Sequence, residues 1–397
     1  MMGEVRVLEL YSGIGGMHYA FKESGVPAQV VAAVDINTIA NQIYKHNFPE
    51  TPLWNKTIEG ITLDDFNKLS FDMITMSPPC QPFTRIGLQG DVSDSRTKSF
   101  LYILDVLPRL EKLPRFILLE NVKGFETSSA RERLLKTLTN CGYTFQEIMV
   151  SPTSVGIPNS RLRYFLLAQS SAGDSDVQIN SQICDAFPPP AESAPPQQPS
   201  VLSPTCRTSG QTEEEVHGDH VLYKRETAAE VEKKLVQNND PSVRQIQDFL
   251  EPQMDVNMEP YLLPPKTLLR YAPVLDIVQP NCRRSVCFTK GYGRYVEGTG
   301  SVLQTCMETQ IDAVFSGLDQ LSEEEKLQQL LKLKLRYFTP REVANLMGFP
   351  HSFSFPQQIS TIQKYRVLGN SLNVVVVSKL IQLLLTPPRS ADTTQVC

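Results

Sequence analysis

The first 35 residues carry the pattern that most restricts the fold. Residues 6–10 and 28–34 predict buried strands, and residues 17–24 between them predict a helix. The turn at residues 11–16, YSGIGG, is rich in glycine, so the backbone can approach a ligand closely at the N-terminus of that helix. This succession predicts a doubly wound α/β fold, a Rossmann-like sheet with helices on both faces. The spacing G-x-G-G differs from the G-x-G-x-x-G of dinucleotide sites, and a tight turn without a ligand explains the glycines equally well.

An acidic residue ends the second predicted strand. Asp35 lies about 20 residues past the glycine turn, where a carboxylate commonly accepts hydrogen bonds from ribose hydroxyls. The same side chain could instead cap a helix predicted over residues 36–46. Both roles can hold at once.

A cysteine follows the next predicted strand. Residues 69–76 predict a buried strand, and Pro78 and Pro79 end it because proline offers no N–H to a neighbouring strand. Cys80 therefore stands on a stiff loop at the carboxyl end of a strand, where ligands bind in open α/β sheets. A thiol held there can act as a nucleophile once it is deprotonated. A lone cysteine more often only fills space in a core, but the surrounding Pro-Pro-Cys-Gln sequence favours the nucleophile.

Three charged residues are predicted at the same edge of the sheet. Residues 116–119 predict a strand that ends in Glu120, and a carboxyl group sheltered by apolar strands can stay protonated and act as an acid. A lone glutamate after a strand is more often a helix cap. Arg161 and Arg163 alternate with apolar residues as they enter a strand, so both are predicted to point to one face. Two guanidinium groups there suit a phosphate or a polarised carbonyl, although a solvated edge strand would show the same pattern.

The second half of the chain changes composition twice. Residues 170–205 are rich in proline, serine, glutamine and alanine, which predicts a disordered linker or surface insertion. The last predicted helix covers residues 374–385, with Asn370 and Ser371 expected near the glycine turn. We therefore predict a main domain at 1–185 and 337–397, a disordered insertion at 186–240, and a smaller domain at 241–336.

The most basic stretch is residues 281–295, NCRRSVCFTKGYGRY. It interleaves cations with aromatic residues, which suits phosphate contact combined with base stacking, although a plain strand-turn-strand fits about as well. The net charge of −5 argues against a general polyanion binder, so any nucleic-acid contact must come from such a local patch.

Cysteine usage and hydropathy indicate the compartment. The eight cysteines are scattered, without the paired spacing of a metal site or a disulfide framework. This predicts free thiols in a reducing, intracellular compartment and no metal. We expect no membrane span and no secretory signal.

Six short motifs, taken together and in order, resemble the cytosine-5 methyltransferases of the DNA-methyltransferase type. They are ELYSGIGG at 9–16, SPPCQPF at 77–83, ENV at 120–122, SRLRYF at 160–165, the segment from RE at 341–342 to GFP at 348–350, and GNS at 369–371. Cys287-Phe288-Thr289 resembles the signature of the subgroup that methylates tRNA. The resemblance also implies that the smaller domain at 241–336 is a target-recognition domain. The insertion from about residue 170 to residue 237 departs from the shared pattern and has no assigned role.

The resemblance implies S-adenosylmethionine as the methyl donor and S-adenosylhomocysteine as the product. The implied cofactor-binding residues are Tyr11, Ser12, Gly13, Ile14, Gly15, Gly16, Asp35, Ile58, Glu59, Ser77, Asn370 and Ser371. The implied catalytic residues are Cys80, which attacks C6 of a cytosine, Glu120, which holds N3 and the exocyclic amine, Arg163, which holds O2, and Arg161, which organises Cys80 or a backbone phosphate. The predicted nucleic-acid contacts are Arg85, Arg96, Arg284, Cys287, Phe288, Thr289, Lys290, Tyr292 and Arg294.

The substrate is predicted to be RNA rather than DNA. The chain shows no zinc-binding region or basic tail, and its net charge is negative, whereas a long DNA duplex favours more cationic surface. An unpaired cytosine in a folded RNA lowers the cost of base extrusion. With the Cys-Phe-Thr resemblance this implies methylation of a cytosine in the anticodon loop of tRNA, the aspartate tRNA in this subgroup, by a cytoplasmic and also nuclear monomer. The alternatives are a DNA cytosine-5 methyltransferase and a non-catalytic nucleic-acid-binding protein with a degenerate site.

Overall fold

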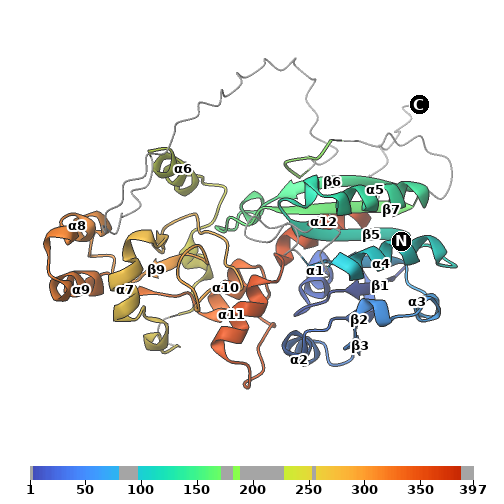
Figure 1. Ribbon diagram of the computed structural model, residues 1–397, viewed down its shortest axis with the longest axis horizontal. Coiled ribbons are helices and arrows are strands. Elements are labelled where there is room, and N and C mark those ends of the chain that lie inside the picture. The colour runs from blue at the N-terminus through green and yellow to red at the C-terminus, as the bar shows by residue number, and fades with distance from the viewer. Residues whose placement is uncertain (1–2, 80–96, 171–181, 188–227, 253–255, 386–397) are drawn as a thin grey trace, which may run out of the picture.

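The computed structural model describes residues 3–79, 97–170, 182–187, 228–252 and 256–385. Within these residues, a seven-stranded sheet and a three-stranded sheet are formed. The larger sheet lies on the right of Figure 1 and the smaller one on the left, with the helices α10 (Pro340–Leu346) and α11 (Thr361–Gly369) between them.

The larger sheet is mostly parallel. Its strand order is β3-β2-β1-β4-β5-β7-β6, in which β7 pairs antiparallel with both β5 and β6 and the other pairs are parallel. The strands are β1 (Val5–Leu10), β2 (Ala28–Val34), β3 (Leu53–Trp54), β4 (Met73–Met76), β5 (Phe116–Val122), β6 (Tyr143–Val150) and β7 (Arg163–Ser170). The chain builds outward from β1 to β2 and β3, then crosses to β4 and β5 on the other side. The gap between β1 and β4 is therefore the topological switch point, where ligands bind in such sheets.

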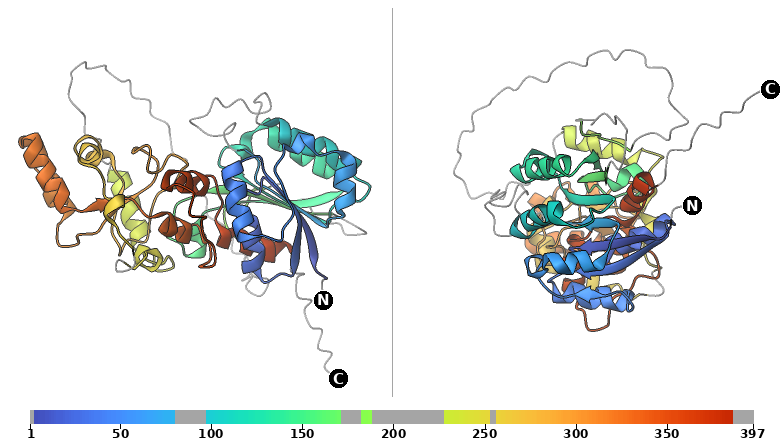
Figure 2. Two further views of the ribbon diagram at one scale, coloured as in Figure 1. Left: turned by 90° about the horizontal axis from the view of Figure 1, so that it is seen from below. Right: turned by 90° about the vertical axis from the view of Figure 1, so that its right-hand side faces the viewer.

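Helices cover both faces of this sheet, as Figures 1 and 2 show. One face packs with α1 (Gly16–Ser24), α2 (Thr38–Asn47) and α12 (Val374–Leu385), and the other with α3 (Leu63–Leu69), α4 (Lys98–Val106) and α5 (Ser129–Asn140). The buried strands read as nearly continuous apolar runs because both faces are covered. The doubly wound α/β fold predicted from the sequence is confirmed.

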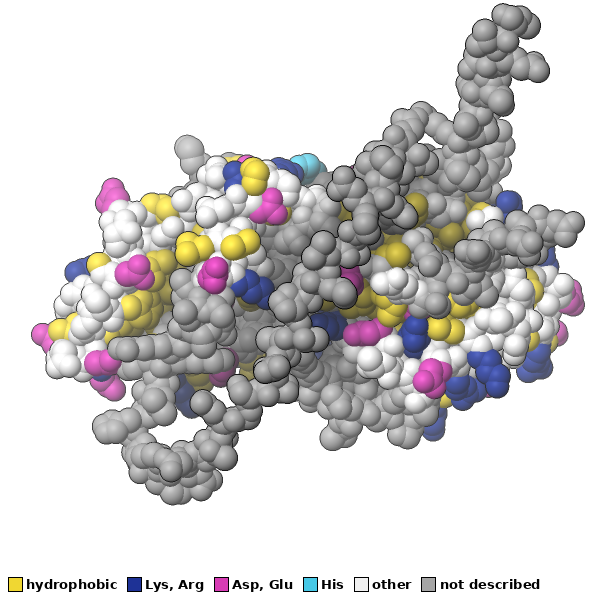
Figure 3. Space-filling view, turned by 90° about the horizontal axis from the view of Figure 1, so that it is seen from above, with side chains coloured by type: hydrophobic (Ala, Val, Ile, Leu, Met, Phe, Trp, Pro, Cys, Tyr) yellow, Lys and Arg dark blue, Asp and Glu magenta, His cyan; other side chains and the backbone are white. Residues whose placement is uncertain are grey.

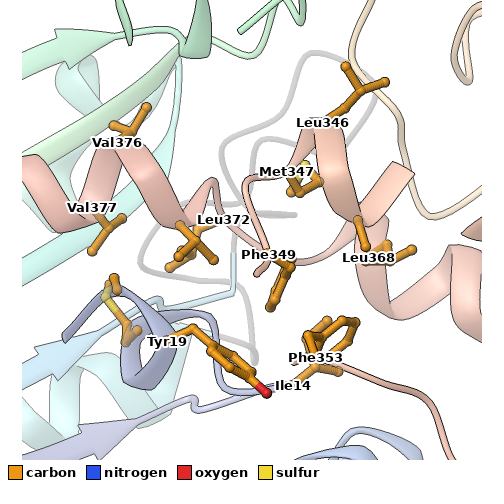
Figure 4. Close-up of a cluster of buried hydrophobic side chains, with 14 of the residues drawn as sticks. Ile14, Tyr19, Leu346, Met347, Phe349, Phe353, Leu368, Leu372, Val376 and Val377 are labelled. Carbon is orange, nitrogen blue, oxygen red and sulfur yellow. The ribbon is translucent and has the colours of Figure 1, made fainter. Parts of the chain in front are cut away.

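The last helix, α12, packs against the first helix, α1, and completes the apolar core around it. Figure 4 shows Leu372 just before α12, and Val376 and Val377 in its first turn, close to the cluster that contains Tyr19 of α1. The ring of Tyr19 meets the edge of Phe353 with centroids 5.8 Å apart. By length and apolar composition alone, Thr361–Leu385 could cross a membrane, but these residues form two helices, α11 and α12, and 56% of the apolar window is buried inside the protein. That is the pattern of a core helix.

The smaller sheet has the order β10-β9-β8. Its strands are β8 (Ile277–Val278), β9 (Val302–Gln304) and β10 (Leu335–Arg336), and the helices around it are α6 (Ala228–Asn238), α7 (Pro265–Tyr271), α8 (Ile311–Phe315) and α9 (Glu323–Lys332). A fully buried ion pair between Arg336 and Glu342, 2.7 Å long, joins β10 to α10. Each guanidinium Nη atom donates to one carboxylate oxygen of Glu342, so the small sheet is held firmly to the segment that leads back to the larger one.

Several predicted boundaries are corrected. The strand predicted at 69–76 covers only 73–76, because α3 runs to Leu69 and Ser70 then adopts a left-handed backbone with φ 48°. The strand predicted at 116–119 continues through Glu120 to Val122, because β7 pairs with it over that whole length. The helix predicted at 374–385 has those limits in the structure.

Candidate active site

The carboxyl ends of β1, β2, β4 and β5 open on one cavity of about 360 Å³ at the switch point. The predicted site residues that line it are Tyr11, Ser12, Gly13, Ile14, Gly16, Asp35, Ser77, Glu120, Arg161, Arg163, Asn370 and Ser371. Residues from both ends of the chain thus meet around a single hollow.

The glycine turn shapes the first wall of this cavity. Gly13 and Gly15 have φ angles of +53° and +86°, a left-handed backbone that glycine adopts most easily. A Cβ on Gly16 would lie 3.0 Å from Leu372 and 3.2 Å from the Ser371 hydroxyl, so a side chain there would push the C-terminal segment away. The expectation that Ser371 lies near the glycine turn is confirmed.

Asp35 holds the turn from the end of β2. Its carboxylate accepts hydrogen bonds from the backbone N–H groups of Gly13 at 2.8 Å and Asn37 at 2.7 Å. Burial raises the pKa of Asp35, and these backbone donors oppose the rise. The helix-cap reading of Asp35 is wrong, because the Asn37 side chain accepts from the N–H groups of Ile39 and Ala40 and so caps α2.

Three predicted cofactor residues, Gly15, Ile58 and Glu59, do not line the cavity. Ile58 is buried in the core on the far face of the sheet, and Glu59 is exposed on the adjacent 3-10 turn, Ile58–Gly60. Gly15 acts through the backbone, since it is the N-cap of α1. The lining residues outside the predicted set are Met17, Ile36, Asn37, Ala40, Pro78, Pro79, Val122, Val367, Gly369 and Leu372. Ile36 could have been found, because it directly follows Asp35 and leaves an apolar side chain 63% exposed at the ligand edge.

A nucleoside-bearing cofactor fits this half of the cavity. The Ser12 hydroxyl is buried and has no hydrogen-bond partner among the described residues. Asp35 retains lone pairs for ribose hydroxyls, and the exposed Ile36 offers an apolar surface for a base. The glycine turn keeps Cβ atoms out of the space between them.

Glu120 and Arg163 form the opposite wall. The Arg163 Nε lies 3.3 Å from the Glu120 Oε1, and both side chains are largely buried. Burial raises the pKa of Glu120, and the nearby Arg163 and Arg161 only partly counter that rise. The wall therefore presents a carboxyl group that tends to hold its proton beside a guanidinium donor.

Arg161 connects three distant segments of the chain. Its side chain is 4% exposed, and its Nη atoms donate to the carbonyl oxygens of Phe288 at 3.2 Å, of Gly369 at 3.1 Å and of Ser371. It precedes β7, which begins at Arg163, but both arginines line the same cavity and both contact the Cys287 Sγ, so the two side chains point to one side as predicted. Its Nη donors are directed at protein atoms, so Arg161 links these three segments, while its buried Nε has no partner among the described residues.

Cys287 lies beside both arginines. Its Sγ is 3.2 Å from the Arg161 Nη1 and 4.0 Å from the Arg163 Nη2. Burial raises the pKa of the Cys287 thiol, but the two guanidinium groups outweigh it and bring the pKa below its usual value. The side chain of Asn159 holds this segment by donating to the Ser285 hydroxyl at 3.1 Å and to the Val286 carbonyl at 3.0 Å.

Part of the predicted nucleic-acid surface is buried. Arg284 is 5% exposed and forms a bidentate ion pair with Asp276, while Phe288 and Tyr292 are 1% and 2% exposed core residues. These three are structural, so their prediction as contacts is corrected. Lys290 and Arg294 are exposed, and Cys287 and Thr289 are half-buried. Cys80, Arg85 and Arg96 lie outside the described residues.

A mostly parallel sheet with a ligand cavity at its switch point and an antiparallel β7 near its edge is the fold of the S-adenosylmethionine-dependent methyltransferases. The sequence matches the family described as C-5 cytosine-specific DNA methylase over residues 5–385, and the chain belongs to that family.

Relatives and solved structures agree with this assignment. A human protein named tRNA (cytosine(38)-C(5))-methyltransferase is 59% identical, over 96% of this chain and 100% of its own length. A crystal structure of a DNMT2 mutant from Spodoptera frugiperda is similar with a TM-score of 0.74 and 39% identity, covering 96% of this chain and 99% of that one. The structure of the Schizosaccharomyces pombe Dnmt2 methyltransferase gives a TM-score of 0.71 and 35% identity, covering 98% and 100%.

Proposed function

We propose that this protein transfers a methyl group from S-adenosylmethionine to C5 of cytosine 38 in the anticodon loop of tRNA, with aspartate tRNA as the substrate. The position and the RNA class are those named for the human relative. The observation that carries the proposal is the pairing of Glu120 with Arg163 on one wall of the cavity whose other wall holds Asp35 and the glycine turn.

The first wall would bind the cofactor. Asp35 would accept hydrogen bonds from the ribose, Ile36 would cover the base, and the buried Ser12 hydroxyl would find its missing partner. When bound, S-adenosylmethionine would supply an electrophilic methyl group on a sulfonium.

The second wall would bind the cytosine. O2 and N3 are neighbours on the pyrimidine ring, and Arg163 and Glu120 present a donor and a carboxyl group side by side. Arg163 would hold O2, while Glu120 would hold N3 and accept from the exocyclic amine. Because burial raises the pKa of Glu120, this carboxyl group can donate its proton to N3.

Cys80 would supply the nucleophile. It is bonded to Pro79, which lines the cavity. Its thiolate would add to C6, and protonation at N3 would leave an enamine that makes C5 nucleophilic. After C5 is methylated, loss of the C5 proton and expulsion of the thiolate would restore the aromatic ring, and N3 would return its proton to Glu120. The base must leave its stack to reach this cavity.

The test is sequencing of modified cytosines in tRNA incubated with the protein and cofactor. We expect methylation at cytosine 38 with wild-type protein and none with Cys80→Ala, which should still bind the cofactor. A covalent complex with RNA that contains 5-fluorocytosine should form only when Cys80 is present, since only an attacking thiol gives that adduct. A wild-type protein that gives neither product nor adduct would be a non-catalytic nucleic-acid-binding protein.

DNA methylation is the second candidate, and the family description favours it. The drawn face in Figure 3 carries acidic and basic side chains interspersed rather than a broad basic field. That surface suits a compact RNA better than a long duplex. A competition assay decides between them: methyl incorporation into duplex DNA at the rate seen with tRNA would defeat the RNA assignment.

A further inference from the structure

Cys287 carries a thiol that the proposed reaction does not use, and it lies between the active site and a second cavity. That cavity, of about 470 Å³, is lined by Cys287 and by residues around the small sheet, and none of its lining residues lines the active-site cavity. We call it the small-sheet cavity. The Cys287 Sγ is also 3.2 Å from the Arg161 Nη1 and 4.0 Å from the Arg163 Nη2, and both arginines line the active-site cavity. One sulfur atom therefore contacts the active-site arginines and faces a separate hollow.

The two guanidinium groups favour the thiolate form of Cys287. A positive group close to sulfur stabilises the thiolate, which is the form that reacts with oxidants. Burial raises the pKa of Cys287, but Arg161 and Arg163 outweigh burial and bring the pKa below its usual value. Cys141 is the natural contrast, because it is also half-buried and burial raises its pKa.

The small-sheet cavity gives a small oxidant access to this sulfur. A water molecule takes about 30 Å³ of liquid volume, so a hydroperoxide of a few heavy atoms fits into about 470 Å³ without any movement of the walls. Val274, Val286 and Val296 line the cavity and are half-buried. Such apolar walls admit a neutral molecule at lower cost than an ion.

The same cluster can stabilise the oxidised sulfur. Oxidation adds to Sγ an oxygen atom that accepts hydrogen bonds. The Arg161 side chain is 4% exposed and is directed at Sγ through Nη1, and its Nε has no hydrogen-bond partner among the described residues. The contact from the Arg163 Nη2 to Sγ, at 4.0 Å, is long, so this donor can pair with an added oxygen.

We propose that Cys287 is a site of reversible oxidation by hydroperoxides, and that the oxidised residue inhibits the enzyme by binding Arg163. The Cys287 thiolate attacks one oxygen of the hydroperoxide, so that an S–O bond forms, the O–O bond breaks and sulfur is oxidised by two electrons to sulfenic acid. The departing hydroxide or alkoxide takes a proton from water. A dithiol reductant reverses the change: its first thiol forms a mixed disulfide with loss of water, and its second thiol then releases Cys287 as the free thiol.

The oxidation itself does not depend on the proposed function, but its effect on activity does. Arg163 lies 3.3 Å from Glu120 and is proposed to hold O2 of the cytosine. An oxygen on Cys287 would compete with the base for the Arg163 guanidinium and would leave Asp35 and the glycine turn as they are. Oxidation should therefore lower kcat/KM for RNA and leave the affinity for the cofactor unchanged.

The first experiment maps oxidation on the full-length protein. The protein is exposed to hydrogen peroxide in the presence of dimedone, which traps sulfenic acid, and labelled cysteines are identified by mass spectrometry. Cys287 should be labelled about tenfold or more faster than Cys141, because the arginines stabilise its thiolate and the cavity gives access to it. Equal or slower labelling of Cys287 overturns the proposal.

Two tryptophan variants test the route of access. Val296→Trp fills the small-sheet cavity and should slow the labelling of Cys287 about tenfold. The matched control is Val236→Trp, at a side chain of α6 that is 66% exposed and does not line the cavity, and it should be labelled like wild type. A folded Val296→Trp that is labelled at the wild-type rate contradicts this route, and the comparison of Cys287 with Cys141 in wild-type protein decides the proposal if this variant does not fold.

The second experiment measures activity before and after peroxide. The kcat/KM of wild type with tRNA should fall about tenfold or more and recover with dithiothreitol, while calorimetry finds the cofactor affinity unchanged. Cys287→Ser should keep the rate that it shows before treatment. An equal loss in Cys287→Ser would assign the inhibition to another cysteine and overturn the proposal. Untreated wild type that methylates no RNA would overturn the proposed function, while the dimedone labelling would still decide whether Cys287 is oxidised, so the two failures are distinguishable.

Discussion

Glu9 is a buried acid in the strand that leads into the glycine turn, and its ionisation should lower the stability of the fold as pH rises. It lies in β1 and is 1% exposed. Tyr44 of α2 donates to its Oε2 at 2.8 Å, and the Tyr44 hydroxyl also shares a hydrogen bond with the His18 Nδ1 of α1 at 2.9 Å. Burial raises the pKa of Glu9 from 4.5 to about 8, because the hydrogen bond from Tyr44 only partly compensates for lost water.

The sign of the effect follows from proton binding. Between pH 4.5 and 8 the folded protein keeps the proton on Glu9 and the unfolded chain has lost it. Stability is therefore highest below the unfolded pKa and falls as pH rises, by about 1.4 kcal/mol per unit, until the folded group ionises near pH 8. From pH 6 to pH 8 this single group should cost about 2 kcal/mol of unfolding free energy.

Glu9→Gln removes the titration and keeps an oxygen to accept from Tyr44. Urea denaturation of wild type and Glu9→Gln at pH 6, 7 and 8 measures the effect, with the exposed Glu50→Gln as control. The variant should lose about 2 kcal/mol less than wild type over that range. Parallel stability curves for all three proteins would refute the reasoning, because they would mean that Glu9 is already ionised in the folded state.

Three further predictions concern the active site. Glu120→Gln can still hold the base but cannot transfer a proton, so kcat should fall about 10²- to 10⁴-fold, as single-turnover kinetics would show, while calorimetry should find unchanged cofactor affinity. Burial raises the pKa of Glu120, so the kcat of the wild-type protein should also decline at high pH. This decline at high pH should be absent in the variant. Asp35→Ala removes a charged acceptor and should weaken cofactor binding about 10- to 100-fold, while kcat at saturating cofactor changes little. Arg161→Lys cannot reach three carbonyl groups at once, so it should lower stability by about 2–4 kcal/mol and reduce kcat more than RNA affinity, as denaturation and steady-state kinetics would show. An unchanged pH dependence in Glu120→Gln would contradict the first prediction. Unchanged cofactor affinity in Asp35→Ala would contradict the second, and an unchanged melting curve in Arg161→Lys would contradict the third.

The sequence predicted the sheet and the edge of the site well, because hydrophobic periodicity is local. It could not predict which members of the basic segment 281–295 point inward. Arg284 is buried because both carboxylate oxygens of Asp276 accept from it, and the Ser301 hydroxyl in turn donates to Asp276. Tyr292 is buried because its hydroxyl donates to the Ser301 carbonyl and accepts from the Phe338 N–H. Such partners are set by tertiary packing, and an irregular loop has no period that would reveal them.

The two arginines show both what the alternation could predict and what it could not. Both side chains line one cavity, as alternation predicted, although β7 begins only at Arg163. Arg161 lies before the strand, where its direction is set by three carbonyl groups that come from residues 288, 369 and 371. The contacts of Arg161 can therefore be identified only in the folded structure, where segments more than 100 residues apart in the sequence lie together.

The site is completed last in any folding order that begins locally. The glycine turn, β2 and β4 can form one wall of the cavity from the first 79 residues, but Asn370, Ser371 and Leu372 reach it only after α12 packs against α1. Gly16 is the contact point, since any side chain there would meet Leu372 at 3.0 Å. Arg161 donates both to this C-terminal segment and to the Phe288 carbonyl, so it connects the cavity to the segment that leads to the small sheet. Neither end of the chain alone is therefore expected to form a stable part of the cavity. The cavity forms only when the whole chain has folded.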